Sequence, residues 1–451
     1  MRRAIESIVA FVVLAVSFAS EARAEVRRVP EQYVTITAAI AASYDGDVVE
    51  VGPGTYAEGL NFGGREITVR STAGAATTIV DPVSGRCLTA TGQKGAAARL
   101  EGFTLRGGSA DNGGGVYVSS SSPVLVNCVI TGNESTSNEG GGVYVASGSP
   151  KLVGCTVSQN LAGVYGGGVY LASGSLVLEN CVVSGNELTY PYDGYGAGIY
   201  AASGMTVTIT GGAIRGNRGG ASGAGIYGGT LSITGCAIES NVLTVSSGGG
   251  GGGISNAAVT MTGGSVSLND STGRGGALNS VTGQISNCVL SGNSSVGNGG
   301  AVWSSGTLSL TGCTVEQNDA GGYGGTWYVN GGTATLQTSQ VKNNMAVTVG
   351  GVWVQTGTAR VGGTTFCGNG VNINGAWTDL GGNQLNGQCP PYCLGDASGN
   401  AIVDGADLGL TINRWGPCQG DACYSDFNND GIVNGADLAE VLSHWGHCPG
   451  Y

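Results

Sequence analysis

The chain has 451 residues, of which 41% are hydrophobic and only 11% charged, whereas a disordered chain would show the reverse balance. Glycine is the outlier at 87 residues, while proline counts only 10, which excludes a collagen-like chain and indicates many tight turns between short strands. The formal net charge of −12 argues against a nucleic-acid partner and does not favour an acidic polysaccharide.

Residues 1–24 have the pattern of a secretory signal peptide. Arg2 and Arg3 form a basic start, Ile8 to Phe18 is an apolar run, and Ala22-Arg23-Ala24 is a cleavage site. The apolar run is too short to cross a bilayer as a finished helix, so an uncleaved anchor is the less favoured alternative. We expect secretion to the extracellular space or the cell surface, with no transmembrane segment in the mature chain. Cleavage removes three Arg and two Glu, so the mature chain has a formal net charge of 15 minus 28, or −13.

Residues 25–100 predict an N-terminal cap followed by the first coils of a solenoid. Thr35 to Ser43 reads as a short amphipathic helix that covers the first coil, because an open coil would expose apolar core and unpaired strand edges. A turn and strand follow in Asp45 to Val51, and Gly52 to Tyr56 leads into the coils. Further strands are expected at Ile67–Arg70 and Thr78–Val80.

Residues 101–388 carry one repeated unit: Gly-Gly-x-aliphatic-aromatic, a short apolar strand, then Cys-x-aliphatic-x-x-Asn. Each unit holds three apolar segments too short for helices, and their period is two. This predicts about ten coils of a right-handed, three-sheeted, single-stranded parallel β-helix. The closing Asn recurs at spacings of 24 to 31 residues, at Asn133, Asn160, Asn186, Asn217, Asn241, Asn269, Asn293, Asn318, Asn344 and Asn369.

Positions that repeat in every coil predict which side chains face inward. The Cys position, for example Cys155, and the aliphatic two residues later, for example Val157, are both expected in the core. The closing Asn is expected to adopt a positive φ and to bond the Asn above and below, a structural role. Stacked thiols fit the dihedral of a disulfide poorly, so buried free thiols are favoured over disulfides. The odd count of 13 cysteines leaves at least one unpaired.

Two parts of the sequence resemble known β-helix proteins. The segment AAIAASYDGDVVEVGPGTYAEGLNF is similar to the N-terminal cap of pectin-lyase-like right-handed β-helix proteins. The Gly-Gly-x-x repeats with a closing Asn resemble those of polymorphic outer-membrane-type β-helix proteins. Together the resemblances cover about residues 28–388 and imply an all-β fold. They leave the activity open, because this fold class holds lyases, hydrolases, epimerases and non-catalytic surface proteins.

No catalytic constellation stands out in the coils, and catalytic residues stay unknown. A lyase of this class would need carboxylates that bind Ca²⁺ and a Lys or Arg base, and a hydrolase two or three carboxylates. Acidic residues are sparse, and Glu134, Glu187, Asp270 and Asp319 directly follow a closing Asn, where a solvated turn explains them. The two histidines, His444 and His447, lie beyond the coils. The basic residues do not form one column: Arg215, Arg218, Arg274, Lys342 and Arg360.

An aromatic column is the best candidate for function within the coils. It alternates with inward aliphatic residues and is therefore expected to face outward, where its rings could bind sugars by their apolar faces. Ordinary stacking between coils is the structural alternative. Its possible carbohydrate-binding members are Tyr117, Tyr144, Tyr170, Tyr200, Tyr227, Trp303, Tyr328 and Trp353.

Residues 389–451 form a different unit, with two copies offset by 30 residues. Each copy contains a loop with oxygen side chains at the spacing of an EF-hand-type Ca²⁺ loop. The stronger site is expected at 426–437, with Asp426, Asn428, Asp430, Ile432 (by its carbonyl), Asn434 and Asp437. The weaker site has Ala401 where the loop favours Gly, and its ligands would be Asp396, Ser398, Asn400, Ile402 (carbonyl), Asp404 and Asp407.

A short helix is expected after each loop, and none before it. Each helix has apolar residues at i, i+4 and i+7: Leu408, Ile412, Trp415 and Leu438, Leu442, Trp445. A duplicated loop with an exit helix and Asp at position 12 resembles the dockerin type I module of cellulosomal proteins over residues 393–448. The resemblance implies a small α-helical calcium-binding domain and a cohesin-like protein or cell-surface scaffold as partner.

The same unit departs from the dockerin pattern and leaves its disulfides open. Loop positions 10 and 11, usually polar in that family, are Gly405-Ala406 and Gly435-Ala436. The flanking cysteines could clip each copy, Cys393 to Cys418 and Cys423 to Cys448, or could join the two ends.

Two functions fit these patterns. One is a secreted, non-catalytic β-helix that binds carbohydrate or a surface and is anchored through a Ca²⁺-dependent module. The other is a polysaccharide-degrading lyase or glycoside hydrolase built on the same rod.

Overall fold

The computed structural model describes residues 24–92, 98–190, 192–245, 249–385, 389, 395–398, 402–417, 425–428 and 431–447. The signal-peptide prediction concerns residues that, except for Ala24, lie outside this part of the chain. In the described part, no helix has the length and apolar character needed to span a bilayer.

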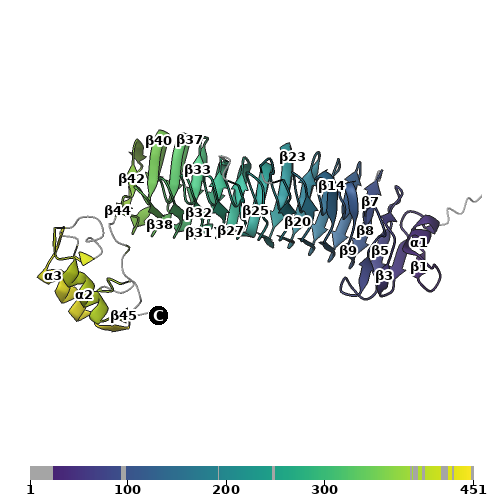
Figure 1. Ribbon diagram of the computed structural model, residues 1–451, viewed down its shortest axis with the longest axis horizontal. Helices are drawn as coiled ribbons and strands as arrows, with labels where there is room; N and C mark the ends of the chain where they lie inside the picture. Colours follow the sequence, from purple (N-terminus) through teal and green to yellow (C-terminus); the bar gives the residue numbers. More distant parts are fainter. Residues whose placement is uncertain are drawn as a thin grey trace, which may run out of the picture.

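The main body is a rod of stacked coils in sequence order, from β1 (Val26–Val29) at one end to β44 (Gln384–Leu385) at the other (Figure 1). It is a parallel β-solenoid of about 14 turns. The expectation of about ten coils was too low, because it counted only units that close with an Asn. The stretch from β1 to β9 (Thr104–Arg106) already forms coils, and strands also follow Asn369.

Sheet 1 carries the aromatic position of the repeat. Its strands are β4 (Leu60–Asn61), β7 (Leu88–Thr91), β11 (Val116–Ser119), β15 (Val143–Val145), β19 (Val169–Leu171), β26 (Ile254–Ser255), β29 (Leu278–Asn279), β33 (Val302–Ser304), β42 (Ile373–Asn374) and the first parts of β23 (Ile199–Thr210), β25 (Ile226–Glu239), β37 (Trp327–Gln337) and β40 (Val352–Gly362).

Sheet 2 follows it in each coil. It contains β1, β2 (Val48–Val51), β5 (Thr68–Ser71), β8 (Arg99–Glu101), β12 (Val124–Val126), β16 (Lys151–Val153), β20 (Ser175–Glu179), β27 (Ala258–Ser267), β30 (Thr282–Ser286), β34 (Leu308–Thr311), β43 (Trp377–Asp379) and the later parts of β23, β25, β37 and β40.

Sheet 3 contains the strands that start after the Cys position. They are β3 (Gly54–Tyr56), β6 (Thr78–Val80), β9, β13 (Val129–Thr131), β17 (Thr156–Ser158), β21 (Val182–Ser184), β24 (Ala213–Arg215), β31 (Val289–Ser291), β35 (Thr314–Glu316), β38 (Gln340–Lys342), β41 (Thr365–Cys367), β44 and the ends of β25 and β27.

Short strands after the closing Asn form two further small sheets. One holds β10 (Ser109–Asn112), β14 (Glu134–Glu139), β18 (Leu161–Ala162) and β22 (Glu187–Leu188), and the other β28 (Asp270–Ser271), β32 (Ser294–Ser295), β36 (Asp319–Ala320) and β39 (Met345–Ala346).

The core is built from the inward positions that the repeat predicts. Val157 and its equivalents on sheet 3 are fully buried, and so are Val207 and Leu231 on sheet 2. The thiols at the Cys position are buried and free, as expected, and Cys87 joins them. Because parallel strands stack the same position of successive coils, one inward side chain fixes the direction of the whole column.

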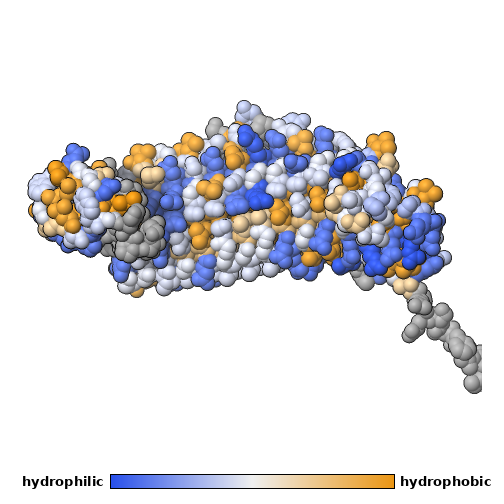
Figure 2. Space-filling model, turned by 90° about the horizontal axis from the view of Figure 1, so that it is seen from below, coloured by the Kyte–Doolittle hydropathy of each residue, from blue (hydrophilic) through white to orange (hydrophobic). Residues whose placement is uncertain are grey.

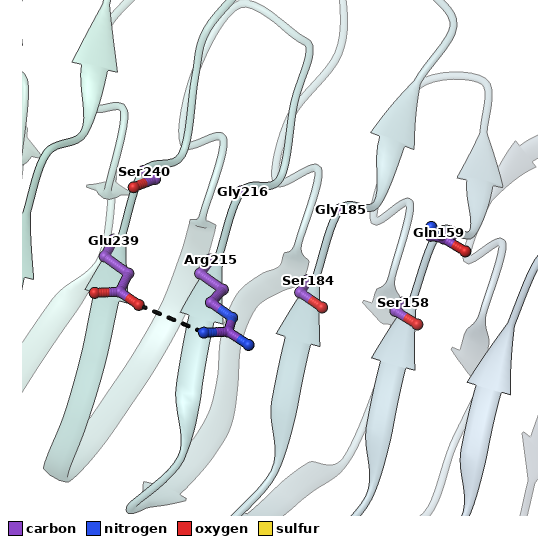
Figure 3. A pocket seen from close by; sticks show the side chains of 8 residues that line it. All are labelled: Ser158, Gln159, Ser184, Gly185, Arg215, Gly216, Glu239 and Ser240. Carbon is purple, nitrogen blue, oxygen red and sulfur yellow. Dashed lines mark ion pairs between the residues drawn. The ribbon is translucent and has the colours of Figure 1, made fainter. Parts of the chain in front are cut away.

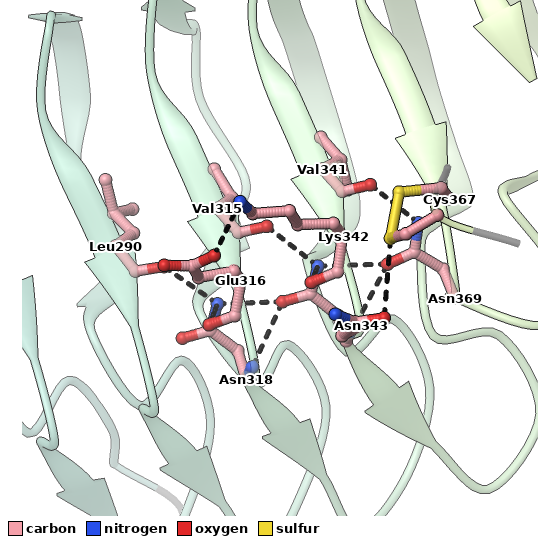
Figure 4. Close-up of polar contacts among 11 residues, drawn as sticks. Leu290, Val315, Glu316, Asn318, Val341, Lys342, Asn343, Cys367 and Asn369 are labelled. Atoms are coloured by element: carbon pink, nitrogen blue, oxygen red, sulfur yellow. Dashed lines mark hydrogen bonds and ion pairs between the residues drawn. A yellow bond between two sulfur atoms is a disulfide. The ribbon is translucent and has the colours of Figure 1, made fainter. Parts of the chain in front are cut away.

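The Asn ladder is buried and connects the coils. The Asn241 backbone N–H and Nδ2 both donate to Oδ1 of Asn269, at 3.1 and 2.9 Å, and Nδ2 also donates to the Ile214 carbonyl. Figure 4 shows the same pattern near the C-terminal end, at Asn318 and Asn369. The prediction of bonds between neighbouring Asn side chains is therefore confirmed.

The prediction of a positive φ at the ladder Asn is wrong. The positive φ lies at the residue directly before it in all ten coils, for example Gly132, Gln159, Ser240 and Leu268, with φ between 53° and 63°. The backbone changes direction at that residue. The side chain of the following Asn therefore points inward to its buried partners.

The N-terminal cap has the expected helix. Helix α1 (Ile36–Ala42) begins after Thr35, whose hydroxyl accepts from the Ala38 backbone N–H, and buries Ile36 and Ile40 against the first coil. At the other end of the rod, a disulfide joins Cys367 to Cys389. The spacing of the cysteines does not single out this pair.

The C-terminal residues form two short loop-and-helix units. Helices α2 (Gly405–Asn413) and α3 (Gly435–Ser443) pack together. Strand β45 (Ile402–Val403) of the first unit pairs antiparallel with β48 (Gly446–His447) of the second, and β46 (Gly416–Pro417) with β47 (Ile432–Val433). The four cysteines that flank the two copies lie outside the described residues.

Candidate carbohydrate-binding surface and calcium-type loops

Five tyrosines on sheet 1 form a continuous stack, one from each of five successive coils. They are Tyr117, Tyr144, Tyr170, Tyr200 and Tyr227, with ring centroids 5.0–5.6 Å apart and planes within 3–10° of parallel. Strands β11, β15, β19, β23 and β25 pair in register, which places the five rings directly above one another.

A second, shorter row of tyrosines packs beside this stack. Tyr165 and Tyr195 stack on each other at 5.9 Å, and they tilt by 43–48° against Tyr170, Tyr200 and Tyr227. Neither residue is among the predicted members of the aromatic column. Their signal is a Tyr-Gly pair in which the Tyr lies five residues before the sheet 1 tyrosine, as at Tyr165 before Tyr170.

Neighbouring rings cover the faces of the stacked tyrosines, which are all half-buried. At the first ring, the Arg86 guanidinium lies 4.7 Å from the Tyr117 centroid. Burial raises the pKa of Tyr170 and of Tyr200, and the nearby Glu139 and the other tyrosines raise it further. The row therefore offers protonated phenol groups and ring edges to a ligand, rather than open ring faces.

The aromatic column does not continue as one stack to the C-terminal end. Ser255 and Asn279 interrupt it. Beyond the gap, Trp303 and Tyr328 are each only 8% exposed, and the Arg274 guanidinium lies over the Trp303 ring at 5.1 Å. Trp353 stays partly exposed and packs against Tyr323 at 4.5 Å.

A shallow depression of about 600 Å³ lies on sheet 3. Ser158, Ser184, Arg215 and Glu239 point into it from neighbouring coils (Figure 3). The Arg215 guanidinium and the Glu239 carboxylate are 3.9 Å apart. Glu239 is the only carboxylate among its lining residues, whereas glycoside hydrolysis uses a pair.

Some charged groups of the coils pair with one another. Arg215 and Lys342 occupy the same outer position of sheet 3, and each pairs with the carboxylate of a neighbouring coil; Lys342 Nζ lies 3.1 Å from Glu316. The other three basic candidates lie elsewhere, so the expectation that the five do not form one column agrees with the structure. Among the described residues, no group of three or more His, Cys, Asp or Glu is arranged to hold a metal. Hydrophobic residues on the long side seen in Figure 2 are scattered among hydrophilic and neutral ones.

The two loops before α2 and α3 have the same local structure. Asp407 and Asp437, at loop position 12, are fully buried at the third position of each helix. Asp437 accepts from the backbone N–H groups of Phe427 and Asn434, at 2.7 and 2.8 Å. Burial alone would raise the pKa of Asp407, but hydrogen bonds from the backbone of Asp404 and Ser398 outweigh it and lower that pKa.

The donor chemistry of these loops fits a hard cation such as Ca²⁺. Gly431, at position 6 of the second loop, has φ +85°, and its N–H donates to Asp426 at 2.9 Å. Asn428, Ile432 and Asn434 belong to the same loop. The first loop contains Asp396, Ser398, Ile402 and Asp404, and the Ser398 hydroxyl donates to Asp396 at 3.1 Å. The remaining predicted ligands, Asn400 and Asp430, lie outside the described residues.

The apolar residues of the two helices divide between core and surface. Leu408 packs against a small core of Val403, Phe427 and Val441. Because α2 ends at Asn413 and α3 at Ser443, the two tryptophans expected within the helices lie just beyond them. The later apolar positions face solvent, with exposed fractions of 53–56% at Ile412, Trp415, Leu442 and Trp445. The buried face instead contains the position-12 aspartates, which must turn inward to reach the loops.

Comparison with a protein-family model agrees with this architecture. The family model described as a right handed beta helix region matches residues 89–272. The chain is a right-handed parallel β-solenoid. Among solved structures, the crystal structure of pectate lyase Pel9A is similar, with a TM-score of 0.35 and 13% identity over 86% of this chain and 80% of that one. No curated protein matches the sequence.

Proposed function

We propose that this chain is a secreted, non-catalytic rod that binds carbohydrate along its tyrosine rows and is anchored through a calcium-dependent module. The observation that carries the proposal is the row of phenol groups on sheet 1, because several identical donors at a fixed spacing suit a ligand that is itself a repeating chain of hydroxyl groups. The stack is rigid, so little side-chain entropy is lost on binding.

The charged groups of the coils support a binding role over a catalytic one. A lyase or hydrolase would need a free base or paired carboxylates beside the sugar. Here the Glu239 and Glu316 carboxylates each face a cation of a neighbouring coil. The lyase or hydrolase alternative is tested by the assay below.

The binding proposal is tested with the double variant Tyr170→Phe, Tyr200→Phe. It removes two hydroxyls from the row and keeps the stacked rings, so the fold should be retained while affinity for neutral polysaccharides falls roughly tenfold. Tyr44→Phe is the control, because Tyr44 is 77% exposed in the N-terminal cap, outside the rows. A glycan array and isothermal titration give the readout.

Two outcomes would count against this function. The binding role fails if no polysaccharide binds the unmodified chain. Release of reducing sugar or of unsaturated products from a polysaccharide panel would establish the lyase or hydrolase alternative instead.

The anchoring module should take up two Ca²⁺ ions, more tightly at 426–437 than at 396–407. Calorimetry should show uptake that Asp437→Ala weakens at least tenfold. Asp437 also completes the helix cap, so Asn428→Ala serves as a second variant at an exposed ligand position. Asp379→Asn, an exposed acid of the rod, is the control. No heat at millimolar Ca²⁺ would refute the assignment of both loops.

A protein partner such as a cohesin-like scaffold remains part of the proposal. The exposed Trp415 and Trp445 side chains would supply apolar contacts to it at equivalent places of the two copies. Secretion of the full chain, with loss of residues 1–24, would be shown by N-terminal sequencing of the exported protein.

A further inference from the structure

Sheet 2 carries a regular array of short hydroxyl side chains over six successive coils. Its middle column is Thr208, Ser232, Thr260, Gln284, Ser309 and Thr335, each in register with the next. Flanking columns run from Thr206 to Thr333 and from Thr210 to Gln337. Of the eighteen outward positions, fifteen are Ser or Thr.

The direction of these side chains is fixed by the core beneath them. Except beside Gly283, the outward residues alternate with buried hydrophobic residues, such as Val207, Ile209 and Ile233, at 0–2% exposure. All eighteen outward residues are exposed or half-exposed. A slip by one residue would bury the hydroxyls and expose the core, so the array is held in one arrangement.

The array is neutral, unlike the rest of sheet 2. Towards the N-terminal end, the same outward columns carry ion pairs, including Arg70 with Glu50 and Lys151 with Glu179. Arg360 marks the other border, in register with Thr335. Between these borders the outward columns contain no charged and no aromatic residue. The tyrosine rows proposed to bind carbohydrate carry phenol groups, and this face has none.

The spacing of the array is set by β geometry in two directions. Hydroxyls recur about every 4.8 Å from coil to coil and about every 6.6 Å along a strand, which is two residues. Liquid water has no long-range order that a regular spacing of hydroxyls could match. Ice does have such order, so each hydroxyl can take the place of one lattice oxygen while the threonine methyl fills the space beside it. The oxygen rows on faces of hexagonal ice recur at comparable intervals, somewhat shorter than the coil spacing and somewhat longer than the two-residue spacing.

We propose that this threonine face binds ice crystals. The neutral hydroxyl lattice is complementary in charge and in hydrogen bonding to an ice surface, and the rigid rod adsorbs there and slows crystal growth. The proposal is independent of the carbohydrate-binding role of sheet 1.

The purified full chain should separate the melting and freezing temperatures of ice and should suppress ice recrystallisation. Thr260→Lys places a long, strongly hydrated charge in the middle of the array and should reduce both effects about fivefold or more. The matched control is Ser265→Lys, which lies on the same strand β27 but faces outward from sheet 3. Circular dichroism shows that each variant is folded.

The proposal fails if the unmodified chain leaves the freezing point and the crystal shape unchanged, or if both lysine variants behave alike. If instead the unmodified chain binds an insoluble neutral polysaccharide without affecting ice, and Thr260→Lys abolishes that binding, then the face is a polysaccharide site and the ice assignment is wrong.

Discussion

At the scale of single residues, the ladder asparagines do more for this fold than any other polar side chain. Asn217 uses its backbone N–H and its Nδ2 to bond Oδ1 of Asn241, and Asn241 does the same to Asn269. All three are 0% exposed. Removing one amide would therefore leave donors and a carbonyl buried without partners, which costs about 1–3 kcal/mol for each group.

Asn241→Ala should lower the free energy of unfolding by about 3 kcal/mol, because two donors of Asn217 and the Ile214 carbonyl lose their partner. Denaturant unfolding measures the change. Ser232→Ala, on the surface of the same coil region, should change it by less than about 0.5 kcal/mol. Equal effects of the two variants would show that the ladder is not a source of stability.

Leu268 is the only aliphatic residue among the turn positions before the ladder. It adopts φ +54° although it is 62% exposed, and a left-handed conformation costs a branched side chain about 1 kcal/mol. Leu268→Asn should raise the free energy of unfolding by about that amount, because Asn tolerates this conformation, as at Asn343 with φ +54°. A lower melting temperature would contradict this reading of the turn.

At the scale of elements, the first coil is held by a buried ion pair between β1 and the residue before β2. Arg27 Nη1 lies 2.5 Å from Asp47 Oδ2, and both side chains are nearly buried. Burial alone would raise the pKa of Asp47. The backbone N–H groups of Tyr44 and Glu25, together with the Arg27 guanidinium, outweigh burial and lower this pKa below its ordinary value.

Because the pKa of Asp47 is lower in the folded state, its contribution to stability is present above the unfolded pKa of about 4 and is lost as pH falls below it. Asp47→Asn should cost about 3 kcal/mol at pH 7, since it leaves the buried Arg27 with only the exposed Glu25 as a charged partner. The variant should also lose part of the acid sensitivity seen between about pH 5 and pH 2. Urea midpoints at pH 7 and pH 3 check both effects, and an unchanged pH dependence would contradict the assignment.

At the scale of the whole molecule, stability is a sum over neighbouring coils, so unfolding can begin at either end. Helix α1 covers the N-terminal end, while the Cys367–Cys389 disulfide closes a loop of 22 residues at the other. A loop of this length stabilises by about 3 kcal/mol. Cys367→Ser should therefore speed amide hydrogen exchange in β41 to β44 and leave β1 to β5 unchanged. Uniform exchange along the rod would contradict end-first opening.

The repeat predicts most of this fold, because one position read down many coils averages out local exceptions. It identifies the inward thiols, the Asn ladder and the tyrosine column. It does not locate the positive φ, since Gly, Gln, Ser, Leu and Asn all occupy that turn. Nor does it predict Tyr195 beside Tyr227, or the burial of Trp303 under Arg274, because those contacts join residues of different coils and different parts of the repeat.

The Asn ladder also gives the rod a direction. Between ladder side chains, every bond runs from the N–H groups of one Asn to Oδ1 of the Asn in the next coil towards the C-terminus. The second Nδ2 hydrogen is donated to a carbonyl of the preceding coil. The side-chain amides therefore all point the same way along the axis, as peptide dipoles do in a helix. At the N-terminal end, Asn133 accepts from the Gly108 backbone N–H; at the other, Asn369 donates to Asn372. A new coil inserted anywhere must therefore bring one Asn in the same orientation. The rod can therefore lengthen by whole repeats without a new capping residue, but two such rods cannot be joined head to head.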